Sequence, residues 1–315
     1  MRAALPALAW AALLGACRPD AASLPVVRVH ATVSPLAAEA LSVLAVNRRV
    51  ARVVLVPGLS GAEVAWFGDP AEALAVRDLL APGSAPPQPD VEERWKDREG
   101  RFFPLCARAR ILVVNPRAGL PLVPRHLRDL AHPRLAGMQA LVPLGKGAGP
   151  LTFAALAQVF GEEAASLLAG AIARERPRLA ATDVEVQARV ASGEAAFGLA
   201  GSEQGAAGAV SAAALEAVYP DQDGSGTLVF PTAVALLGRP APSEGARRLA
   251  AWLASSDAEE LVVARAPGYL PLRRGVLLPY GVRSAAEIRS PALDWERLAD
   301  ARARFAERFA SWPAP

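Results

Sequence analysis

The glycine-rich turn at residues 145–150 is the first place where this chain could do chemistry. It reads Gly-Lys-Gly-Ala-Gly-Pro and leads into a stretch with helical spacing of apolar residues. A nucleotide-binding P-loop needs serine or threonine directly after its lysine to hold magnesium, and Gly147 stands there instead. What remains is a turn that opens a helix, whose free N–H groups could hold an oxyanion. A turn that only needs glycine is the alternative.

Metal and catalytic motifs are incomplete. The acidic run at 221–226 hints at a calcium loop, but Thr232 stands where an EF-hand needs its twelfth-position acid. The histidines, His30, His126 and His132, show no metal-ligand spacing. There is no nucleophile elbow and no Cys–His pair, and Cys106 is interpreted as a small buried hydrophobe. The sequence therefore favours a non-enzyme, with an exported enzyme as an alternative.

The N-terminus carries an export signal. Arg2 precedes an apolar run at 3–14 that is too short to span a bilayer, and Leu-Gly-Ala-Cys closes the run at Cys17. These four residues resemble the lipobox of bacterial lipoproteins. This implies a signal peptide at 1–16, lipid on Cys17, a tether at 17–25, and an anchored protein in the periplasm or at the cell surface. A plain signal peptide with an incidental cysteine is the alternative.

Bulk composition excludes several classes of protein. With 52% hydrophobic and 21% charged residues, the chain can bury substantial cores and is not disordered. Its net charge of +3, with scattered arginines, does not indicate a nucleic-acid partner. Once Cys17 is lipidated only Cys106 remains, so no intrachain disulfide can form. The length favours two lobes.

Strand patterns alternate with helical patterns, which predicts an α/β fold with parallel or mixed sheets. Strands are expected at 26–32, 51–56, 61–67, 102–105, 109–114, 138–142, 195–199 and 229–237. Helices are expected at 36–46, 71–80, 152–160, 162–174, 184–191 and 243–253. The last helix carries one apolar stripe, through which it is predicted to dock on the rest of the protein: Leu298, Ala301, Phe305, Phe309 and Trp312.

Five sequence blocks, in order, resemble the ferric-iron substrate-binding proteins of ABC transporters. They lie at 95–115, 127–137, 190–199, 219–228 and 242–253. The resemblance implies the type II periplasmic binding protein fold: two α/β lobes with mixed sheets and a hinge of crossing strands, with ligand between the lobes. It places lobe 1 at 26–112, lobe 2 at 113–227, a return to lobe 1 at 228–268, and a C-terminal segment at 269–315 that docks on lobe 2.

The chain departs from this family where iron would bind. The family's paired tyrosines follow the third block, where this sequence reads Gly201-Ser202-Glu203-Gln204. Its three tyrosines, Tyr219, Tyr269 and Tyr280, lie elsewhere. Lobe 1 also looks shortened, because the interval 57–60 has no room for the helix that the family places there.

By position in the family, a set of residues is expected to face the ligand. They are His30, Ala31, Thr32, Asp69, Gly147, Ala148, Gly149, Thr152, Thr182, Asp183, Ser202, Glu203 and Gln204. For each, a solvated loop or a helix cap is the alternative, and Asp183 in particular could cap a helix.

The resemblance therefore implies a monomeric, extracytoplasmic lipoprotein that captures a small solute for an ABC transporter permease. The solute would be iron(III) or a small oxyanion; iron would be cargo, and no cofactor is expected. The alternative is a degenerate clamp that serves as a sensor or accessory lipoprotein without transport.

Overall fold

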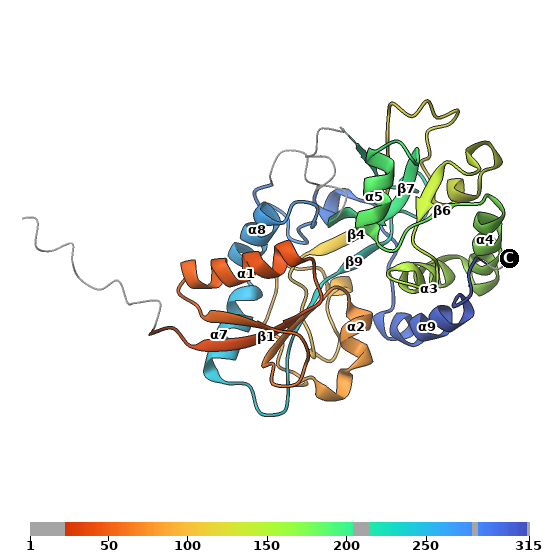
Figure 1. Ribbon diagram of the computed structural model, residues 1–315. Helices are drawn as coiled ribbons and strands as arrows, with labels where there is room; N and C mark the ends of the chain where they lie inside the picture. The colour runs from red at the N-terminus through yellow and green to blue at the C-terminus, as the bar shows by residue number, and fades with distance from the viewer. Residues whose placement is uncertain (1–22, 204–214, 279–282, 314–315) are drawn as a thin grey trace, which may run out of the picture.

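The computed structural model describes residues 23–203, 215–278 and 283–313. These residues form two β-sheets, each covered by its own helices, which we call lobe 1 and lobe 2 (Figure 1). Cys17, Gln204 and Tyr280 lie outside the described residues. The mixed α/β fold predicted from the alternating patterns is confirmed.

Lobe 1 is built on the sheet β10-β3-β1-β2. Strands β1 (Val26–Ala31), β2 (Arg52–Val56) and β3 (Val64–Phe67) are parallel, and β10 (Ala233–Leu236) is antiparallel to β3. Helices α1 (Pro35–Asn47), α7 (Glu244–Leu253) and α8 (Ser256–Arg265) share an apolar core with one face of this sheet. The short helix α2 (Pro70–Ala75) follows β3 directly.

Lobe 2 is built on the sheet β6-β5-β7-β4-β8. Its strands are β4 (Ala107–Val114), β5 (Gln139–Leu141), β6 (Arg178–Leu179), β7 (Phe197–Gly201) and β8 (Glu216–Val218). Its helices are α3 (Gly149–Phe160), α4 (Glu162–Arg174) and α5 (Asp183–Ala191). Because β4 runs antiparallel to β7 while β5 runs parallel to it, the sheet is mixed.

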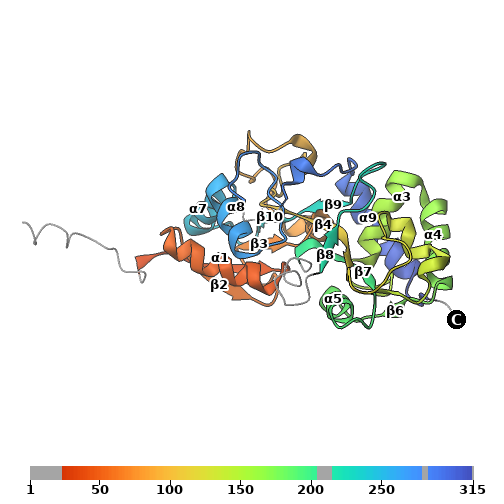
Figure 2. The same ribbon diagram turned by 90° about the horizontal axis from the view of Figure 1, so that it is seen from above.

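Two chain segments cross between the lobes. The first half of β4 pairs with β9 (Val229–Pro231), and its second half pairs with β7 and β8 in lobe 2. From β9 the chain passes Thr232 and continues as β10 in lobe 1. Figure 2 shows β4 and β9 between the two groups of helices. These segments are the hinge of crossing strands that was expected.

The C-terminal helix α9 (Trp295–Arg308) contacts both lobes. Its buried residues, among them Leu298 and Phe305, pack in the same core as Phe153 of α3. It also lies against α2 of lobe 1 (Figure 1). Docking on lobe 2 alone, as expected, therefore describes only part of the packing, because the apolar stripe reaches α3 while polar side chains of α9 reach lobe 1.

Several predicted elements differ from the structure. Helix α2 ends at Ala75, and a separate 3-10 turn, Arg77–Leu79, follows it. Residues 102–105 form no strand within the described chain; Phe103 makes a single bridge to Val234. The strand expected at 229–237 is divided between β9 and β10. Further 3-10 turns lie at Glu93–Trp95, Leu127–Ala131, Pro133–Leu135 and Ala285–Glu287.

Among the described residues, none of the helices combines the length and apolar character needed to cross a membrane.

Candidate functional site

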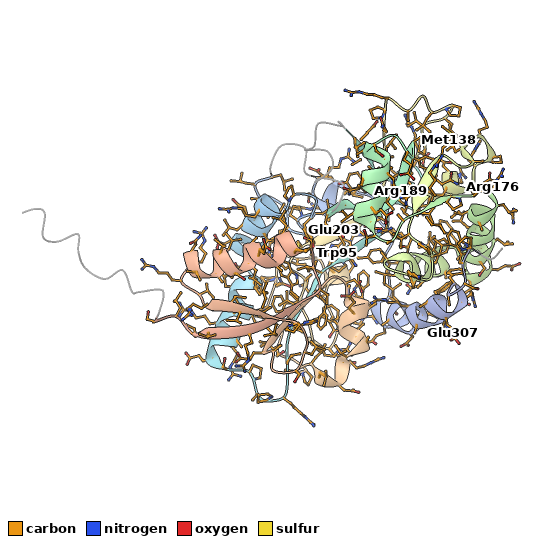
Figure 3. The ribbon with its side chains drawn as sticks, viewed as in Figure 1. Trp95, Met138, Arg176, Arg189, Glu203 and Glu307 are labelled. Atoms are coloured by element: carbon orange, nitrogen blue, oxygen red, sulfur yellow. The ribbon has the colours of Figure 1, made fainter. Side chains whose placement is uncertain are left out.

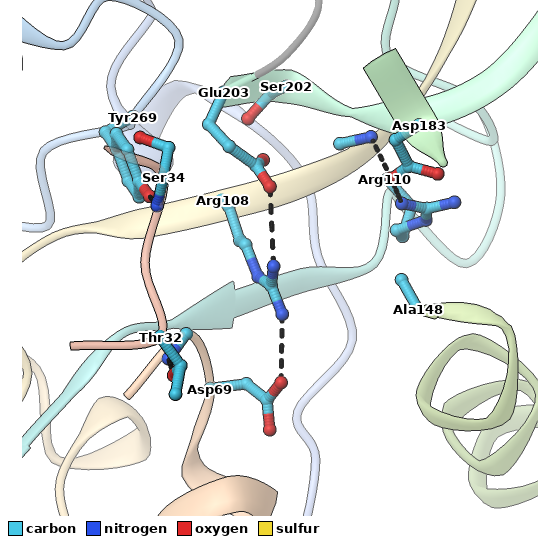
Figure 4. A network of polar contacts seen from close by, with 12 residues as sticks. Thr32, Ser34, Asp69, Arg108, Arg110, Ala148, Asp183, Ser202, Glu203 and Tyr269 are labelled. Carbon is cyan, nitrogen blue, oxygen red and sulfur yellow. Dashed lines mark hydrogen bonds and ion pairs between the residues drawn. The ribbon is translucent and has the colours of Figure 1, made fainter. Parts of the chain in front are cut away.

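Arg108 lies at the centre of a polar network that joins the two lobes. It projects from the crossing strand β4, and its Nη2 donates to Asp69 Oδ2 of lobe 1 at 2.9 Å. Its Nη1 donates to Glu203 Oε1, just after β7 of lobe 2, at 3.3 Å. Figure 4 shows the guanidinium between the two carboxylates, and Figure 3 shows Glu203 between the lobes. One cation thus connects carboxylates that are far apart in the chain.

Two glycines make room for this network. A Cβ atom on Gly68 would lie 3.4 Å from Arg108 Nη2, so the guanidinium rests against bare backbone. A Cβ atom on Gly201 would lie 2.5 Å from Glu203 Oε2, closer than atoms can approach without a shift. The missing side chain at Gly201 therefore leaves room for the folded-back carboxylate, and the guanidinium packs on the backbone at Gly68.

The network is charged and shielded from solvent. The side chain of Asp69 is only 1% exposed and that of Glu203 only 6%. Burial raises the pKa of Asp69 above its ordinary value, against the lowering influence of Arg108. Burial alone would lower the pKa of Arg108, but Glu203 and Asp69 raise it, so the guanidinium stays charged. Arg302 of α9 also approaches Asp69, at 3.7 Å.

A second arginine, Arg110, follows on the same strand and pairs within lobe 2. Its Nη1 donates to Asp183 Oδ2 at 2.5 Å, and the Gly201 N–H donates to the same oxygen at 2.9 Å. Asp183 was considered as a helix cap, but Thr182 is the N-cap of α5 and accepts from the Glu185 N–H. Asp183 is the first residue of the helix, so its carboxylate is free to bind Arg110.

Buried polar atoms around this pair are unsatisfied. Within the described residues, Arg110 Nε, Asp183 Oδ1 and Glu203 Oε2 have no hydrogen-bond partner. Such atoms are rare in folded proteins, because each loses its hydration without compensation. A solute that carries both acceptors and donors would satisfy them.

The start of α3 is drawn on the Arg110 side of the network in Figure 4. Ala148 is the N-cap residue, and among the described residues no side chain caps this end of the helix. Thr152 is buried and donates to the Ala148 carbonyl at 2.7 Å, so it supports the turn. Figure 4 shows Ala148 on the same side as Arg110 and Asp183.

The two glycines of this turn differ in what they tolerate. Gly147 has φ +54°, and a Cβ there would touch only the Val142 side chain, at 3.4 Å. A Cβ on Gly149 would collide with the Leu144 backbone. Gly149 is therefore needed for packing, and its replacement would not report on ligand contact alone.

Of the predicted residues His30, Ala31 and Thr32, the first two end β1 and only Thr32 is linked to the segment that carries Asp69. Thr32 Oγ1 accepts from the Gly68 N–H at 2.9 Å and donates to Glu72, whose backbone N–H is capped by Asp69. His30 Nδ1 lies 3.3 Å from the Val56 carbonyl oxygen, and Ala31 ends the strand. Thr32 thus belongs to the lobe 1 side of the network.

Ser202 is built into the hinge instead. Its hydroxyl donates to the Gly268 carbonyl at 2.6 Å and accepts from the Ala109 N–H at 3.0 Å. Both partners are main-chain groups, and the residue is 2% exposed.

Sequence reasoning missed the two arginines and Tyr269. Arg108 and Arg110 alternate within an otherwise apolar strand, and a charge at such a position needs a buried partner. That signal could have identified them. Tyr269 accepts a hydrogen bond from the Ser34 N–H at 3.0 Å, and burial, then Glu203, raise its pKa. Its proximity to Glu203 depends on tertiary structure alone.

The described residues contain no group of three or more His, Cys, Asp or Glu side chains that could hold a metal ion. Asp69 and Glu203 converge, but a guanidinium lies between them. The arrangement can hold an oxygen-rich solute by hydrogen bonds and charge, and it offers no candidate catalytic set.

Comparison with known families decides the class of protein. The family model of the bacterial extracellular solute-binding proteins matches residues 72–298. The chain belongs to this family. Its members bind solutes and are not enzymes, which confirms the non-enzyme prediction, and the export implied by the sequence fits their extracytoplasmic location. A search of the curated proteins gives no significant match.

Solved solute-binding proteins share the two-lobed fold of this one. Iron-bound HitA from Pseudomonas aeruginosa is 18% identical, with 90% of this chain and 99% of that chain covered and a TM-score of 0.77. The Bordetella ferric binding protein is 22% identical, with coverages of 91% and 98% and a TM-score of 0.73. AfuA from Actinobacillus pleuropneumoniae, with fructose-6-phosphate bound, is 15% identical, with coverages of 91% and 98% and a TM-score of 0.77. The expected two-lobed periplasmic binding fold is confirmed.

Proposed function

We propose that this solute-binding protein captures a small oxyanion, or a solute carrying one, between its lobes and delivers it to an ABC transporter permease. The observation that supports this most directly is Arg110, a 7% exposed side chain whose Nε has no partner among the described residues. The start of α3, which no described side chain caps, is drawn on the same side in Figure 4. Helix N-termini favour negative charge, and guanidinium groups match oxyanion geometry. The residues that would contact the solute are Gly147, Ala148, Arg110 and Asp183.

Iron(III) as the bare cargo is disfavoured by the same geometry. Ferric ion prefers several hard oxygen ligands, and the residues that converge between the lobes already hold a guanidinium. The sugar phosphate in AfuA is a precedent for a non-metal solute on this fold. A phosphorylated polyol would also bring hydroxyl donors for Asp183 Oδ1 and Glu203 Oε2.

Native mass spectrometry of freshly purified protein would identify a carried-over solute. Inorganic phosphate and fructose-6-phosphate should then be titrated into the protein by calorimetry. Arg110→Gln should weaken binding by about ten- to a hundredfold, because a charge-assisted hydrogen bond contributes roughly 1.5–3 kcal/mol. Arg189→Gln removes an arginine of the same lobe that is 27% exposed and pairs with Glu185 on α5, so it should leave binding unchanged. Equal affinity in all three proteins would refute this site.

We also propose that Cys17 carries lipid and anchors the protein as a monomer at the membrane. The support is the Leu-Gly-Ala-Cys ending of the apolar run. Cys17→Ser should release the protein from membranes or leave it unprocessed. A mature, acylated and membrane-bound Cys17→Ser protein would contradict the assignment.

One observation favours the second candidate function, a degenerate clamp without cargo. Arg108 already joins Asp69 of lobe 1 to Glu203 of lobe 2, as a captured ligand would. A protein that never binds solute in the experiments above, although it is folded, would support a sensor or accessory role.

A further inference from the structure

We propose that Arg108 is an intramolecular counter-ion that fills the position of a metal cation and thereby excludes metals from the interlobe site. The inference concerns what the site rejects, so it does not require the solute proposed above to be correct.

The groups around Arg108 would otherwise suit a hard cation. Asp69 accepts at 2.9 Å from one lobe and Glu203 accepts at 3.3 Å from the other. Tyr269 lies close enough to Glu203 for that carboxylate, after burial, to raise the pKa of the phenol. Two carboxylates and a phenol are the oxygen donors that ferric and lanthanide ions prefer over nitrogen and sulfur. The guanidinium takes the place that such an ion would need.

The backbone is shaped for the guanidinium. Gly68 leaves the space against which Arg108 rests, and Gly201 leaves the space into which Glu203 folds. A Cβ atom at Gly68 would meet the guanidinium at ordinary contact distance, whereas one at Gly201 would require the Glu203 carboxylate to move. The side chains of Asp69 and Glu203 are also almost fully buried. The ion pair is therefore part of the built structure and not a chance surface contact.

The two arginines of β4 differ in what they leave free. Both terminal nitrogens of Arg108 are committed, one to each lobe. Arg110 instead keeps a buried Nε without a partner among the described residues. Arg108 thus offsets the charge of the two carboxylates, together with Arg302 near Asp69, and Arg110 is the guanidinium left to meet a solute.

Removing Arg108 should convert the site. Without the guanidinium, the buried carboxylates of Asp69 and Glu203 repel each other unless a proton or a cation enters. A trivalent ion can then bind where the arginine stood. The same reasoning predicts that the wild-type protein rejects that ion.

The test is a calorimetric titration of terbium(III) in chelator-free buffer. Arg108→Ala should bind terbium(III) at least about tenfold more tightly than wild type, equivalent to about 1.4 kcal/mol. Arg108→Gln, which keeps length and a hydrogen-bond donor, serves where the alanine variant does not fold. The double variant Arg108→Gln with Glu203→Gln should lose the gained affinity.

Arg77→Gln is the matched control. Arg77 also bridges two carboxylates, Glu296 at 3.0 Å and Asp300 at 3.4 Å, but all three side chains are at least 41% exposed. Its removal should not create a terbium(III) site. Folded Arg108 variants that bind no better than wild type would overturn the proposal. So would a wild-type protein that already binds terbium(III) in a Glu203-dependent manner. Neither result decides whether phosphate binds, because the calorimetric titration with phosphate tests that separately.

Discussion

At the scale of single residues, neighbouring polar groups at the hinge have separate tasks. Arg108 joins the lobes by charge, whereas Ser202 joins main-chain segments by hydrogen bonds. Ser202 was expected to face the ligand, but its hydroxyl is occupied by Gly268 and Ala109. Its task is therefore to hold the end of β7 against β4.

Ser202→Ala should reduce stability and leave solute affinity largely unchanged. The substitution leaves a buried carbonyl and a buried N–H without their partner, which costs about 1–3 kcal/mol. Urea unfolding monitored by circular dichroism measures the loss. Ser192→Ala, at an exposed serine of α5's C-terminal end, should have a much smaller effect. A stable Ser202→Ala protein with lost solute binding would show that the serine contacts ligand after all.

Position relative to the family's sequence blocks identified the carboxylate of each arginine–carboxylate contact, but not the arginine. Asp69, Asp183 and Glu203 were expected near the ligand, and the structure brings them to the same junction. Their partners were not expected, because Arg108 is 39 residues from Asp69 and 95 from Glu203. No spacing rule links residues so far apart; only the crossing of β4 between the lobes does.

At the scale of elements, the sequence pattern of α9 predicted only part of its packing. Its apolar stripe was visible in the sequence: Leu298, Ala301 and Phe305 are buried within the helix, Phe309 is buried just after it, and Trp312 is half-buried. Its polar face contacts both lobes: Arg302 reaches Asp69 and Glu72, while Arg304 and Arg308 reach Glu162 of α4. Periodicity identifies a buried face but does not reveal which partners the opposite face meets. Helix α8 was not predicted, although Ser255 caps its start.

The contact between α9 and α4 should depend on pH. Hydrogen bonds from Arg304 and then Arg308 lower the pKa of Glu162 below its ordinary value of 4.5. A lowered carboxyl pKa contributes stability above 4.5 that is lost as the pH falls through the folded-state value. Because the group is on the surface, the effect should be small. Thermal melts of Glu162→Gln should lie slightly below wild type at neutral pH and converge with it in acid. Glu163→Gln, at the neighbouring exposed carboxylate, is the control; a constant difference at every pH would contradict the assignment.

At the scale of the whole molecule, the apolar cores do not coincide with the lobes. One core fills the face of lobe 1 covered by α1, α7 and α8. The other runs from Phe67 and Leu74 of lobe 1 through β4 to Phe153 and Phe305. The apolar contact between the lobes is therefore continuous and includes residues of α9. The resemblance to known clamps predicted two lobes, but this continuity follows only from the packing.

Because one core spans both lobes, the protein should unfold as a single cooperative unit. Phe305 is 1% exposed within that core, so Phe305→Ala should lower the free energy of unfolding by about 3–5 kcal/mol. Phe160, which is 55% exposed, is the matched control, and Phe160→Ala should change stability by less than about 0.5 kcal/mol. Scanning calorimetry should give one transition in all three proteins, shifted down as a whole in Phe305→Ala. If the lobes were independent, two transitions would separate and only that of lobe 2 would shift, because the core of lobe 1 beneath α1 contains no part of α9.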